Sequence, residues 1–490
     1  MARPVRLSLL SRASALARLQ AALVERALRA VHPGLEVTCL TRSSAGDQDQ
    51  TSPLWKLPDK GAFTADLSAA LVDGEASLAV HSYKDLPTEM PRGTRIAGAL
   101  PRADARDLLL MRADAVAASP SRLRILSSSP RRAWLLDTSL RPLVPWRVSG
   151  VEAAPVRGNI ETRLRKLVEG DAHGLVIAKA AIDRLLGFGP PFEQEAALIR
   201  ERLAGLRWMV LPMREFPWAP AQGAIAIEVP AGRDELIRLI TPILCTRTAA
   251  AVEYERNVLE QHGGGCHQAL GAAVLDRSYG RVVSIRGRER SDEWTLDGRA
   301  ASFPRASADR IWPRTAETIP AARRRLAVTQ PAADALRVAR AEALPESWSV
   351  PRNVLVWAAG GTTWRKLAAR GVWVNGCADG LGDDEAPNVD LLAGRPVNWL
   401  DLTHDHAPRP NALATYHVDV PLPDDLGRRS HFFWTSGELF RQAIDRWPAI
   451  RDGWHASGPG RTRQTIAAMV APERTGVWLD RESWERDICL

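Results

Sequence analysis

The stretch Ala79-Val80-His81-Ser82-Tyr83-Lys84-Asp85-Leu86-Pro87 decides the fold. It begins inside an apolar run, Ser77-Leu78-Ala79-Val80, that predicts a buried strand, and it ends at a proline, which a central strand does not accommodate. Lys84 and Asp85 therefore stand where a strand runs out into a loop. In open α/β sheets the carboxyl ends of the strands are where ligands bind. A lone Lys-Asp pair is more often a solvated surface pair. Evidence from the rest of the sequence is therefore needed to distinguish a ligand-binding role from a surface role.

Short apolar strands alternate with amphipathic helices around this stretch. Residues 12–31 carry leucines at helical spacing, and residues 35–40 read as an apolar strand. A further helix is predicted near residues 63–71 and a further strand near residues 95–99. Strands and helices that alternate in this way predict βαβ units and a mostly parallel sheet.

The same pattern resumes between residues 105 and 195. Its predicted strands are residues 108–110, 124–126 and 174–178. The turn Ser127-Ser128-Ser129-Pro130 leads into a helix, with the proline at an acceptable first-turn position. Residues 206–228 contain a strand, a proline-rich bend and an apolar return segment. Two α/β lobes joined by such a return segment suit a hinged pair.

The fold class that follows is α/β, with two hinged lobes like those of periplasmic binding proteins, a small α+β domain and a C-terminal α/β domain. The predicted boundaries are residues 1–100 plus 200–228 for lobe 1, 101–199 for lobe 2, 229–343 for the α+β domain, 344–351 for a linker and 352–490 for the C-terminal domain. Residues 333–343 are predicted to be the closing helix of the α+β domain.

Composition restricts the partners. The 490 residues have the apolar and charged fractions of an ordinary globular protein and a formal net charge of +8, carried almost entirely by arginine. The basic residues are spread along the chain instead of forming a patch with aromatics, so no nucleic-acid partner is predicted. The chain lacks an apolar run of about eighteen residues, so no membrane partner is predicted either. We expect a cytoplasmic monomer.

The five cysteines are scattered and form no CxxC pair, which argues against both a disulfide framework and a zinc knuckle. Thiols in a reducing compartment fit this pattern best. His404-Asp405-His406 has potential metal ligands, but two nearby histidines in a proline-flanked loop are usually surface residues, and no metal is predicted.

Eight short segments, spread in order over about residues 5–340, share one resemblance. They are Ser11-Arg12-Ala13-Ser14-Ala15-Leu16-Ala17, Asp59-Lys60-Gly61-Ala62-Phe63, Val80 to Pro87, Arg102 to Asp107, Ser127-Ser128-Ser129-Pro130-Arg131-Arg132, Arg157-Gly158-Asn159-Ile160-Glu161-Thr162-Arg163, Ala221-Gln222-Gly223-Ala224 and Gly264-Gly265-Cys266. Together they resemble hydroxymethylbilane synthase, also called porphobilinogen deaminase. Any one of them could match by chance, whereas eight in register are hard to explain otherwise.

The resemblance implies a transferase that joins four porphobilinogen molecules head to tail, with loss of ammonia at each step, to give the linear tetrapyrrole hydroxymethylbilane. It implies as partners porphobilinogen and the linear polypyrrole intermediates. The chain grows on a dipyrromethane cofactor held by a thioether to a cysteine, which by resemblance is Cys266. A thiolate is a good nucleophile, and the glycines before it allow close backbone approach. Without the resemblance, Cys266, as a single cysteine among five scattered ones, would be interpreted as an inert buried thiol.

Each pyrrole unit carries an acetate and a propionate, so the site needs several fixed cations. Charge-assisted hydrogen bonds contribute about 1.5 to 3 kcal/mol each, and bidentate arginine is the most directional donor. By resemblance the cofactor-binding residues are Lys60, Lys84, Ser129, Arg131, Arg132 and Gly158. The substrate-binding residues are Arg12, Ser14, Arg157 and Arg163. In an arginine-rich chain, any single one of these could equally be a solvated side chain.

Asp85 is the expected catalytic residue. Loss of ammonia from porphobilinogen leaves a cationic methylenepyrrolenine, and a carboxylate near the pyrrole nitrogens can stabilise that charge and carry protons. The arginines repel the cation and hold the acidic arms instead. The loop around Lys60, the Pro220 bend and the residue after Cys266 depart from the family pattern, which affects expectations for loop mobility but removes no charged catalytic group.

Residues 352–490 resemble, more weakly, uroporphyrinogen-III synthase, which cyclises hydroxymethylbilane. The matching pieces are Val354-Leu355-Val356-Trp357, Phe432-Phe433-Trp434-Thr435-Ser436-Gly437 and Ser457-Gly458-Pro459-Gly460. That family has two such domains around a cleft, so one domain is expected to be missing or very degenerate here. Three alternatives stay open: a deaminase with a docking or stabilising domain, a bifunctional enzyme, and a non-enzymatic two-lobed protein that binds anions.

Overall fold

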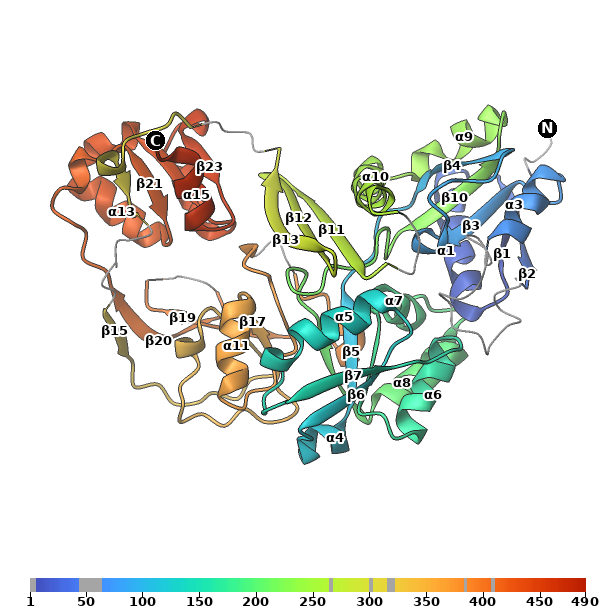
Figure 1. The fold of residues 1–490 in the computed structure, drawn as a ribbon, viewed down its shortest axis with the longest axis horizontal. Helices are drawn as coiled ribbons and strands as arrows, with labels where there is room; N and C mark the ends of the chain where they lie inside the picture. Colours follow the sequence, from blue (N-terminus) through green and yellow to red (C-terminus); the bar gives the residue numbers. More distant parts are fainter. Residues whose placement is uncertain are drawn as a thin grey trace.

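The computed structural model describes residues 6–43, 64–263, 268–298, 303–314, 322–382, 386–406 and 410–490. The strands of these residues form five sheets. In Figure 1 the two lobes lie at the right and at the lower centre, a three-stranded sheet stands above the centre, and two C-terminal sheets lie at the left. Across the described ranges, no helix is both long enough and apolar enough to cross a bilayer.

Lobe 1 is a five-stranded sheet in the order β2-β1-β3-β10-β4. Its strands are β1 (Arg6–Arg12), β2 (Glu36–Arg42), β3 (Leu78–Ser82), β4 (Thr94–Ala99) and β10 (Ile225–Pro230). Helices α1 (Ala15–Val31) and α3 (Ala65–Val72) are the predicted connections. The predicted strand of the opening stretch is confirmed as β3, the central strand, whose residues 78–81 are all buried.

Lobe 2 is a second five-stranded sheet, in the order β7-β6-β8-β5-β9. Its strands are β5 (Asp107–Arg112), β6 (Arg122–Leu126), β7 (Gly150–Ala154), β8 (Gly174–Ala178) and β9 (Leu206–Val210). Its helices are α4 (Ala113–Ala118), α5 (Pro130–Ser139), α6 (Ile160–Glu169), α7 (Lys179–Gly187) and α8 (Glu193–Leu203). Both faces of β5 are buried, because Leu108 and Leu110 pack into one core cluster and Leu109 and Met111 into another.

The expectation of mostly parallel sheets is only partly correct. β1, β2 and β3 are parallel, and so are β6, β7 and β8. β10 pairs antiparallel with β3 and β4, and β5 pairs antiparallel with β8 and β9. Strands β5 and β10 each enter their sheet directly from the other lobe. No crossover helix precedes them in the described residues, and such a helix is what makes neighbouring strands parallel. The chain thus passes twice between the lobes, before β5 and before β10.

The α+β region consists of helix α9 (Asp234–Ile240), helix α10 (Thr246–Gln261) and the antiparallel sheet β11-β12-β13. These strands are Leu270–Arg277, Gly280–Gly287 and Arg290–Asp297. The predicted closing helix at residues 333–343 is wrong. Residues Ala335–Val338 form strand β16, with a short 3₁₀ turn at Ala341–Ala343. A short apolar run buried on both faces cannot be told from a helix by periodicity alone.

The C-terminal part contains two α/β sheets, whereas the sequence led us to expect one domain, with the other missing or very degenerate. The first has the order β15-β20-β19-β16-β17-β18 and the second the order β14-β21-β22-β23. The strands of the first are β15 (Ala322–Arg325), β16, β17 (Leu355–Ala358), β18 (Gly376–Cys377), β19 (Trp399–His404) and β20 (Ala412–Asp419). Those of the second are β14 (Ile311–Trp312), β21 (His431–Trp434), β22 (Trp454–Ser457) and β23 (Thr475–Val477). The accompanying helices are α11 (Gly361–Ala369), α12 (Asp390–Ala393), α13 (Gly437–Arg446), α14 (Arg461–Ala467) and α15 (Arg481–Ile488).

The C-terminal region therefore starts earlier than the predicted linker at residues 344–351. β14 pairs in parallel with β21, and β16 lies between β17 and β19. In the sequence, strand β14 of the second sheet precedes all strands of the first sheet, and β21, β22 and β23 follow them. At the edge of the first sheet, β15 and β20 run antiparallel and pair with each other. These long-range pairings place residues 311–312, 322–325 and 335–338 with the C-terminal sheets.

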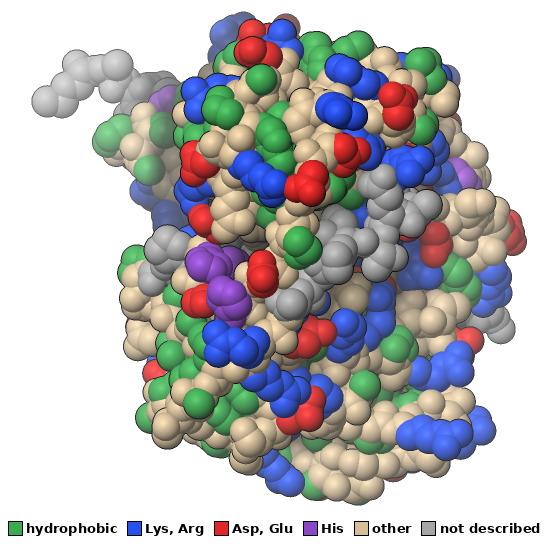
Figure 2. All heavy atoms as spheres, turned by 90° about the vertical axis from the view of Figure 1, so that its left-hand side faces the viewer, with side chains coloured by type: hydrophobic (Ala, Val, Ile, Leu, Met, Phe, Trp, Pro, Cys, Tyr) green, Lys and Arg blue, Asp and Glu red, His purple; other side chains and the backbone are tan. Residues whose placement is uncertain are grey.

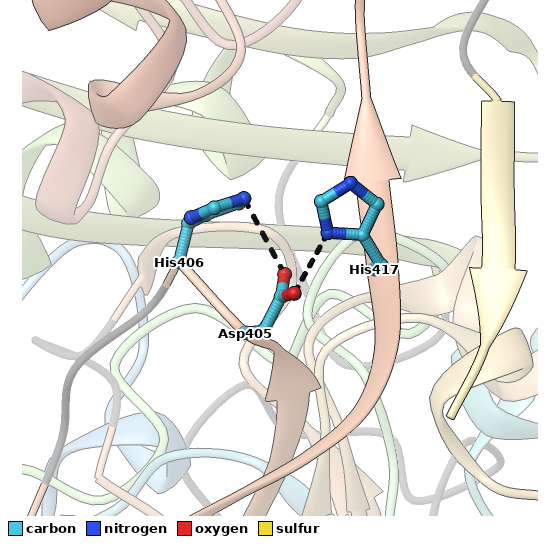
Figure 3. Close-up of side chains that lie close together, drawn as sticks. All are labelled: Asp405, His406 and His417. Carbon is cyan, nitrogen blue, oxygen red and sulfur yellow. Dashed lines mark hydrogen bonds and ion pairs between the residues drawn. The ribbon is translucent and has the colours of Figure 1, made fainter. Parts of the chain in front are cut away.

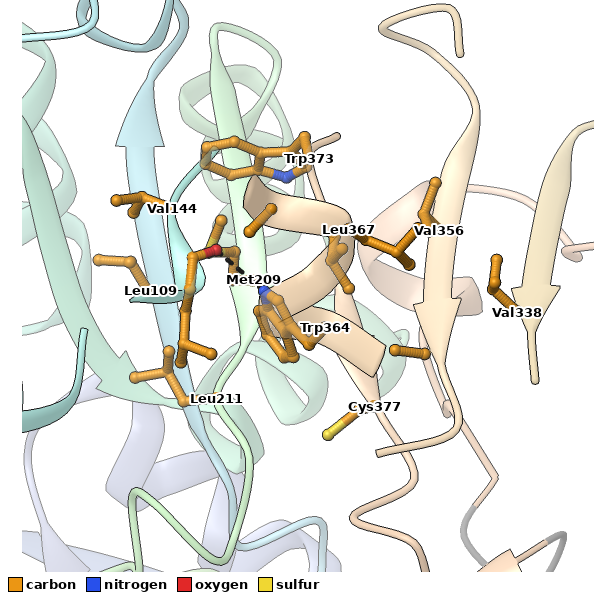
Figure 4. Packing of buried hydrophobic residues seen from close by; sticks show 14 of the residues in the cluster. Leu109, Val144, Met209, Leu211, Val338, Val356, Trp364, Leu367, Trp373 and Cys377 are labelled. Carbon is orange, nitrogen blue, oxygen red and sulfur yellow. Dashed lines mark hydrogen bonds between the residues drawn. The ribbon is translucent and has the colours of Figure 1, made fainter. Parts of the chain in front are cut away.

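The first C-terminal sheet shares a hydrophobic core with lobe 2 (Figure 4). Trp364 on α11 is fully buried, and its indole Nε1–H donates to the carbonyl of Leu143 at 2.9 Å. The indole of Trp373 donates to the carbonyl of Trp208 at 3.2 Å. The backbone N–H of Val210, at the end of β9, donates to the carbonyl of Asn375 at 2.8 Å. Lobe 2 and this sheet therefore pack as one body.

Candidate active site

A cavity of about 670 Å³ lies between the two lobes. It brings together ten of the twelve site residues predicted from the sequence, from both lobes. These ten are Arg12, Ser14, Lys84, Asp85, Ser129, Arg131, Arg132, Arg157, Gly158 and Arg163. The other two predicted residues, Lys60 and Cys266, lie outside the described residues.

Lys84 and Asp85 reach the cavity from a single 3₁₀ turn, Tyr83–Asp85, directly after β3. The strand is anchored behind them by His81, whose Nε2 lies 2.7 Å from a carboxylate oxygen of buried Glu228 on β10. The Lys84 ammonium donates to the side-chain carbonyl of Gln222 at 3.4 Å. Burial lowers the pKa of Lys84 to about 8, against the opposing effect of the neighbouring Asp85 charge. The turn thus holds one cation and one carboxylate at the cavity wall.

Three helices begin at the cavity, each with a side chain that caps its first turn. Ser14 accepts a hydrogen bond from the N–H of Ala17 at the start of α1. Ser129 accepts from the N–H of Arg132 at the start of α5. Asn159 caps α6 in the same way. The positive ends of three helix dipoles therefore face the same space, which favours a negatively charged ligand.

Gly158 needs to be a glycine. Its φ of +110° lies in a region that other residues rarely adopt, and a Cβ there would lie 2.6 Å from the Cγ2 atom of Thr162. This backbone places the Gly158 carbonyl 2.8 Å from the Nε atom of Arg163, which donates to it. Burial, with the charges of Arg132 and Arg157, lowers the pKa of Arg163 to about 10, and the charge of Asp85 opposes this shift. The guanidinium is held in place and stays charged at neutral pH.

Asp107 is the main feature that the sequence analysis missed. It is fully buried at the start of β5 and accepts hydrogen bonds from Arg131 at 2.8 Å and from Arg132 at 2.7 and 3.2 Å. Gln222 donates to it as well, at 2.8 Å. The two guanidinium charges hold the pKa of Asp107 far below its usual range despite its burial. The sequence contained one sign of this role, because Asp107 directly precedes an apolar run, and a carboxylate buried there needs a charged or hydrogen-bonding partner.

The same arginines connect the cavity to the segments that cross between the lobes. Arg131 also donates to the carbonyl of Pro217 at 2.8 Å, just before β10. Gln222 donates to the carbonyl of Ala105 at 2.7 Å, just before β5. A change in the position of either crossing segment therefore changes the position of these side chains.

A second buried carboxylate, Glu255 on α10, was also missed. It pairs with Arg102 through two hydrogen bonds of 2.8 Å and accepts from the indole of Trp218 and the N–H groups of Ala221 and Val274. Arg102 and Ala221 belong to the crossing segments, and Val274 belongs to β11. Glu255 thus joins the crossing segments to the three-stranded sheet.

The charges at the cavity fit a ligand with several carboxylates. Its described lining contains six cations, namely Arg12, Lys84, Arg131, Arg132, Arg157 and Arg163, against three carboxylates, namely Asp85, Glu161 and Glu195. Fixed guanidinium groups suit carboxylate recognition because their planar fork matches two oxygens. A cofactor or substrate made of pyrroles with acetate and propionate arms has the matching charge.

Two α/β lobes around a cavity lined by fixed cations define a class of proteins suited to anionic ligands. The family model described as "Porphobilinogen deaminase, dipyromethane cofactor binding domain" matches residues 7–238. The porphobilinogen deaminase of Methylobacillus flagellatus is 36% identical over 292 residues, which is 58% of this chain and 86% of that protein. The porphobilinogen deaminase of Paraburkholderia phymatum is 38% identical over 55% of this chain and 75% of that protein. The chain belongs to the porphobilinogen deaminase family and contains its cofactor-binding domain, as the sequence resemblance indicated.

Among solved structures, the periplasmic aliphatic sulphonate binding protein SsuA of Escherichia coli matches 53% of this chain and 71% of its own, at 13% identity and a TM-score of 0.28. The effector-binding domain of BenM, solved with benzoate, matches 53% of this chain and 93% of its own, at 12% identity and a TM-score of 0.26. TM-scores this low support no statement about function.

Proposed function

We propose that this chain is a hydroxymethylbilane synthase, a transferase of tetrapyrrole biosynthesis that joins four porphobilinogen molecules with release of ammonia. The observation that carries the proposal is that Asp85 and six cations line one cavity in a member of this family. The cations bind the acidic arms of the ligand, and the Asp85 carboxylate faces the charge that develops during the reaction.

The dipyrromethane cofactor, attached to Cys266, would supply an electron-rich pyrrole carbon as the nucleophile. The described residues that would hold its acidic arms are Lys84, Ser129, Arg131, Arg132 and Gly158. The adjacent arginines already have a carboxylate partner in Asp107, so a ligand carboxylate would share guanidinium groups that are positioned beforehand. Preorganised donors of this kind lose little entropy when the ligand binds.

The residues proposed to receive the incoming porphobilinogen are Arg12, Ser14, Arg157 and Arg163. Fixed contacts with its acetate and propionate orient the substrate, and orientation of two reactants makes a large contribution to rate. Because these groups lie at the starts of α1 and α6, the helix dipoles add to the attraction for the acidic arms.

Asp85 is the proposed catalytic group. When porphobilinogen loses ammonia, the electron pair of the pyrrole nitrogen moves into the ring and leaves a cation. A carboxylate beside that nitrogen stabilises the cation, and it can accept the proton that is lost when the aromatic ring is restored. Six cations in the same cavity cannot do this. Lys84, next to Asp85, balances the carboxylate and contributes to anion binding.

The deciding experiment is intact-protein mass spectrometry combined with a turnover assay. The purified protein should carry the mass of two pyrrole units, and this mass should be lost in Cys266→Ser. Asp85→Asn should keep the adduct and lose most of the turnover, whereas Asp114→Asn, at an exposed site on α4, should keep both. Correctly folded wild-type protein from a porphyrin-producing host with no adduct and no turnover would favour a non-enzymatic anion-binding protein instead.

We also propose a second activity, the cyclisation of hydroxymethylbilane to uroporphyrinogen III, in the C-terminal part. A specific observation favours it over a docking role alone. The two C-terminal sheets enclose a pocket of about 800 Å³ whose described lining includes Arg323, Arg337, Arg340, Arg441 and Arg461. The starts of α13 and α14 line the same pocket, and Ser436 caps α13. A pocket of this charge and size suits a linear molecule with many carboxylates.

The two C-terminal sheets also approach each other closely at one side of this pocket. A Cβ on Gly382 would lie 2.6 Å from the Cα of Gly460, so two backbones meet where larger side chains would not fit. The ring-closing reaction is tested by the isomer that the full-length protein makes from porphobilinogen. Type III product, shifted towards type I by Arg337→Gln but not by the exposed Arg428→Gln, would support the proposal. Type I product from the wild type would refute it without affecting the deaminase assignment.

A further inference from the structure

Three side chains with metal-ligating atoms converge where β19 ends against β20 (Figure 3). Asp405 and His406 directly follow β19, and His417 lies on β20. One ligating atom from each of the three lies within 4.8 Å of the others. Of the sequence triplet His404-Asp405-His406, the structure retains two members and adds His417 from the neighbouring strand. His404 faces Tyr416 instead, with their ring centroids 6.0 Å apart.

The spacing of the three ligating atoms is close to the spacing of ligands around a bound zinc ion. The Nδ1 atom of His417 lies 2.7 Å from one carboxylate oxygen of Asp405, and the Nε2 atom of His406 lies 3.6 Å from the other. Ligand distances of about 2.0 to 2.1 Å in a tetrahedral zinc site place the ligand atoms roughly 3.3 to 3.5 Å apart. No two of these ligating atoms lie more than 4.8 Å apart, so small rotations of the His406 and His417 side chains would bring them to the spacing of a zinc site.

The cluster is accessible to an ion from solution. The side chains of Asp405, His406 and His417 are 31%, 41% and 31% exposed. Figure 2, which views the molecule from its C-terminal side, shows histidine side chains gathered at the surface beside acidic and basic ones.

We propose that Asp405, His406 and His417 form a Zn²⁺ site at the rim of the C-terminal pocket. Two imidazoles and one carboxylate are the ligand set of open zinc sites, in which water occupies the fourth position. The ion fastens the turn after β19 to β20. His406 also lines the pocket, so the fourth position lies at its mouth. The site does not depend on which reaction this pocket carries out.

Neighbouring arginines limit the affinity of this site for Zn²⁺. In the register of β15 and β20, Arg324 stands directly opposite His417, and Arg323 lines the same pocket. Like charges at this distance weaken the binding of a cation, and they also favour an anionic ligand at the fourth position. We expect a dissociation constant on the order of 10 μM, weaker than that of a buried structural site.

The test uses the full-length protein, stripped with a chelator and then titrated with ZnCl₂ by calorimetry. Wild type should bind one Zn²⁺ in this range, and the binding should weaken at least about tenfold in His417→Ala and in Asp405→Asn. Asp419→Asn, at an exposed carboxylate two residues along the same strand, is the matched control and should bind as wild type does. CoCl₂ should give the visible absorption of tetrahedral Co²⁺ in wild type and control only.

Circular dichroism of each variant shows whether its fold is intact, and Asp405→Asn, which keeps the shape of the side chain, guards against a folding defect in His417→Ala. The proposal is overturned if wild type binds no stoichiometric Zn²⁺ below about 100 μM, roughly tenfold above the expected constant. It is also overturned if both variants bind Zn²⁺ as tightly as Asp419→Asn does.

Discussion

Replacement of Asp107 by asparagine tests whether this buried carboxylate holds the two adjacent arginines of the cavity. Asp107 is 0% exposed, and Arg131 is 3% exposed. The substitution leaves two guanidinium charges with a neutral partner that offers one acceptor oxygen. Removal of one member of a buried charge pair costs about 3 to 5 kcal/mol, because the remaining charge is uncompensated. We expect this loss in lobe 2.

Hydrogen exchange of the full-length protein measures the effect locally, which suits a chain of several domains. Amides of β5 and α5 should exchange roughly a hundred to several thousand times faster in Asp107→Asn than in wild type, since about 1.4 kcal/mol corresponds to a factor of ten. Asp114→Asn is the control, because its pair with Arg112 is exposed and worth at most about 1 kcal/mol. If Asp107→Asn changes the exchange of β5 and α5 by less than about tenfold, Asp107 does not hold the arginines as described.

Three further variants test other parts of the structure. Gly158→Ala should lose turnover at least about tenfold with a rise in KM for porphobilinogen, because its Cβ displaces Thr162 and the start of α6; unchanged kinetics would count against this geometry. Trp364→Ala should destabilise lobe 2 and the first C-terminal sheet together, by about 3 to 5 kcal/mol in hydrogen exchange; a change confined to α11 would show that the two do not share a core. Burial and the charge of Glu215 raise the pKa of Asp379 to about 7, so the folded protein binds a proton that the unfolded chain releases near pH 4. The free energy of unfolding should therefore fall as pH rises from about 4 to about 7, by at most about 1.4 kcal/mol per unit of the pKa shift, and Asp379→Asn should flatten that slope in a stability profile against pH.

Local signals were sufficient to predict the two lobes, whereas most residues of the candidate site came from the resemblance to a family. The apolar run before Lys84 is the central strand of lobe 1, and Ser129 caps the helix that carries the adjacent arginines. Strand ends and helix starts converge in such sheets, so residues placed there by the sequence also meet in space. Ten of the residues that the resemblance implied line one cavity.

What the sequence did not reveal depends on contacts between distant residues. Asp107 acquires its role only when β5 brings it under the arginines of α5. Strand β16 was read as a helix, because its pairing with β17 and β19 is not encoded in its own four residues. The same applies to β14, whose partner β21 lies more than a hundred residues further along. His417 joins Asp405 only through the pairing of β19 with β20.

The core shared by lobe 2 and the first C-terminal sheet also has an evolutionary consequence. A stop codon after β13 would leave the apolar neighbours of Trp364 in lobe 2 open to water, and a surface of this kind promotes aggregation. Loss of the C-terminal half would then require polar replacements at several positions at once. Deletion of the C-terminal region is therefore disfavoured, and descendants are expected to inherit both parts together.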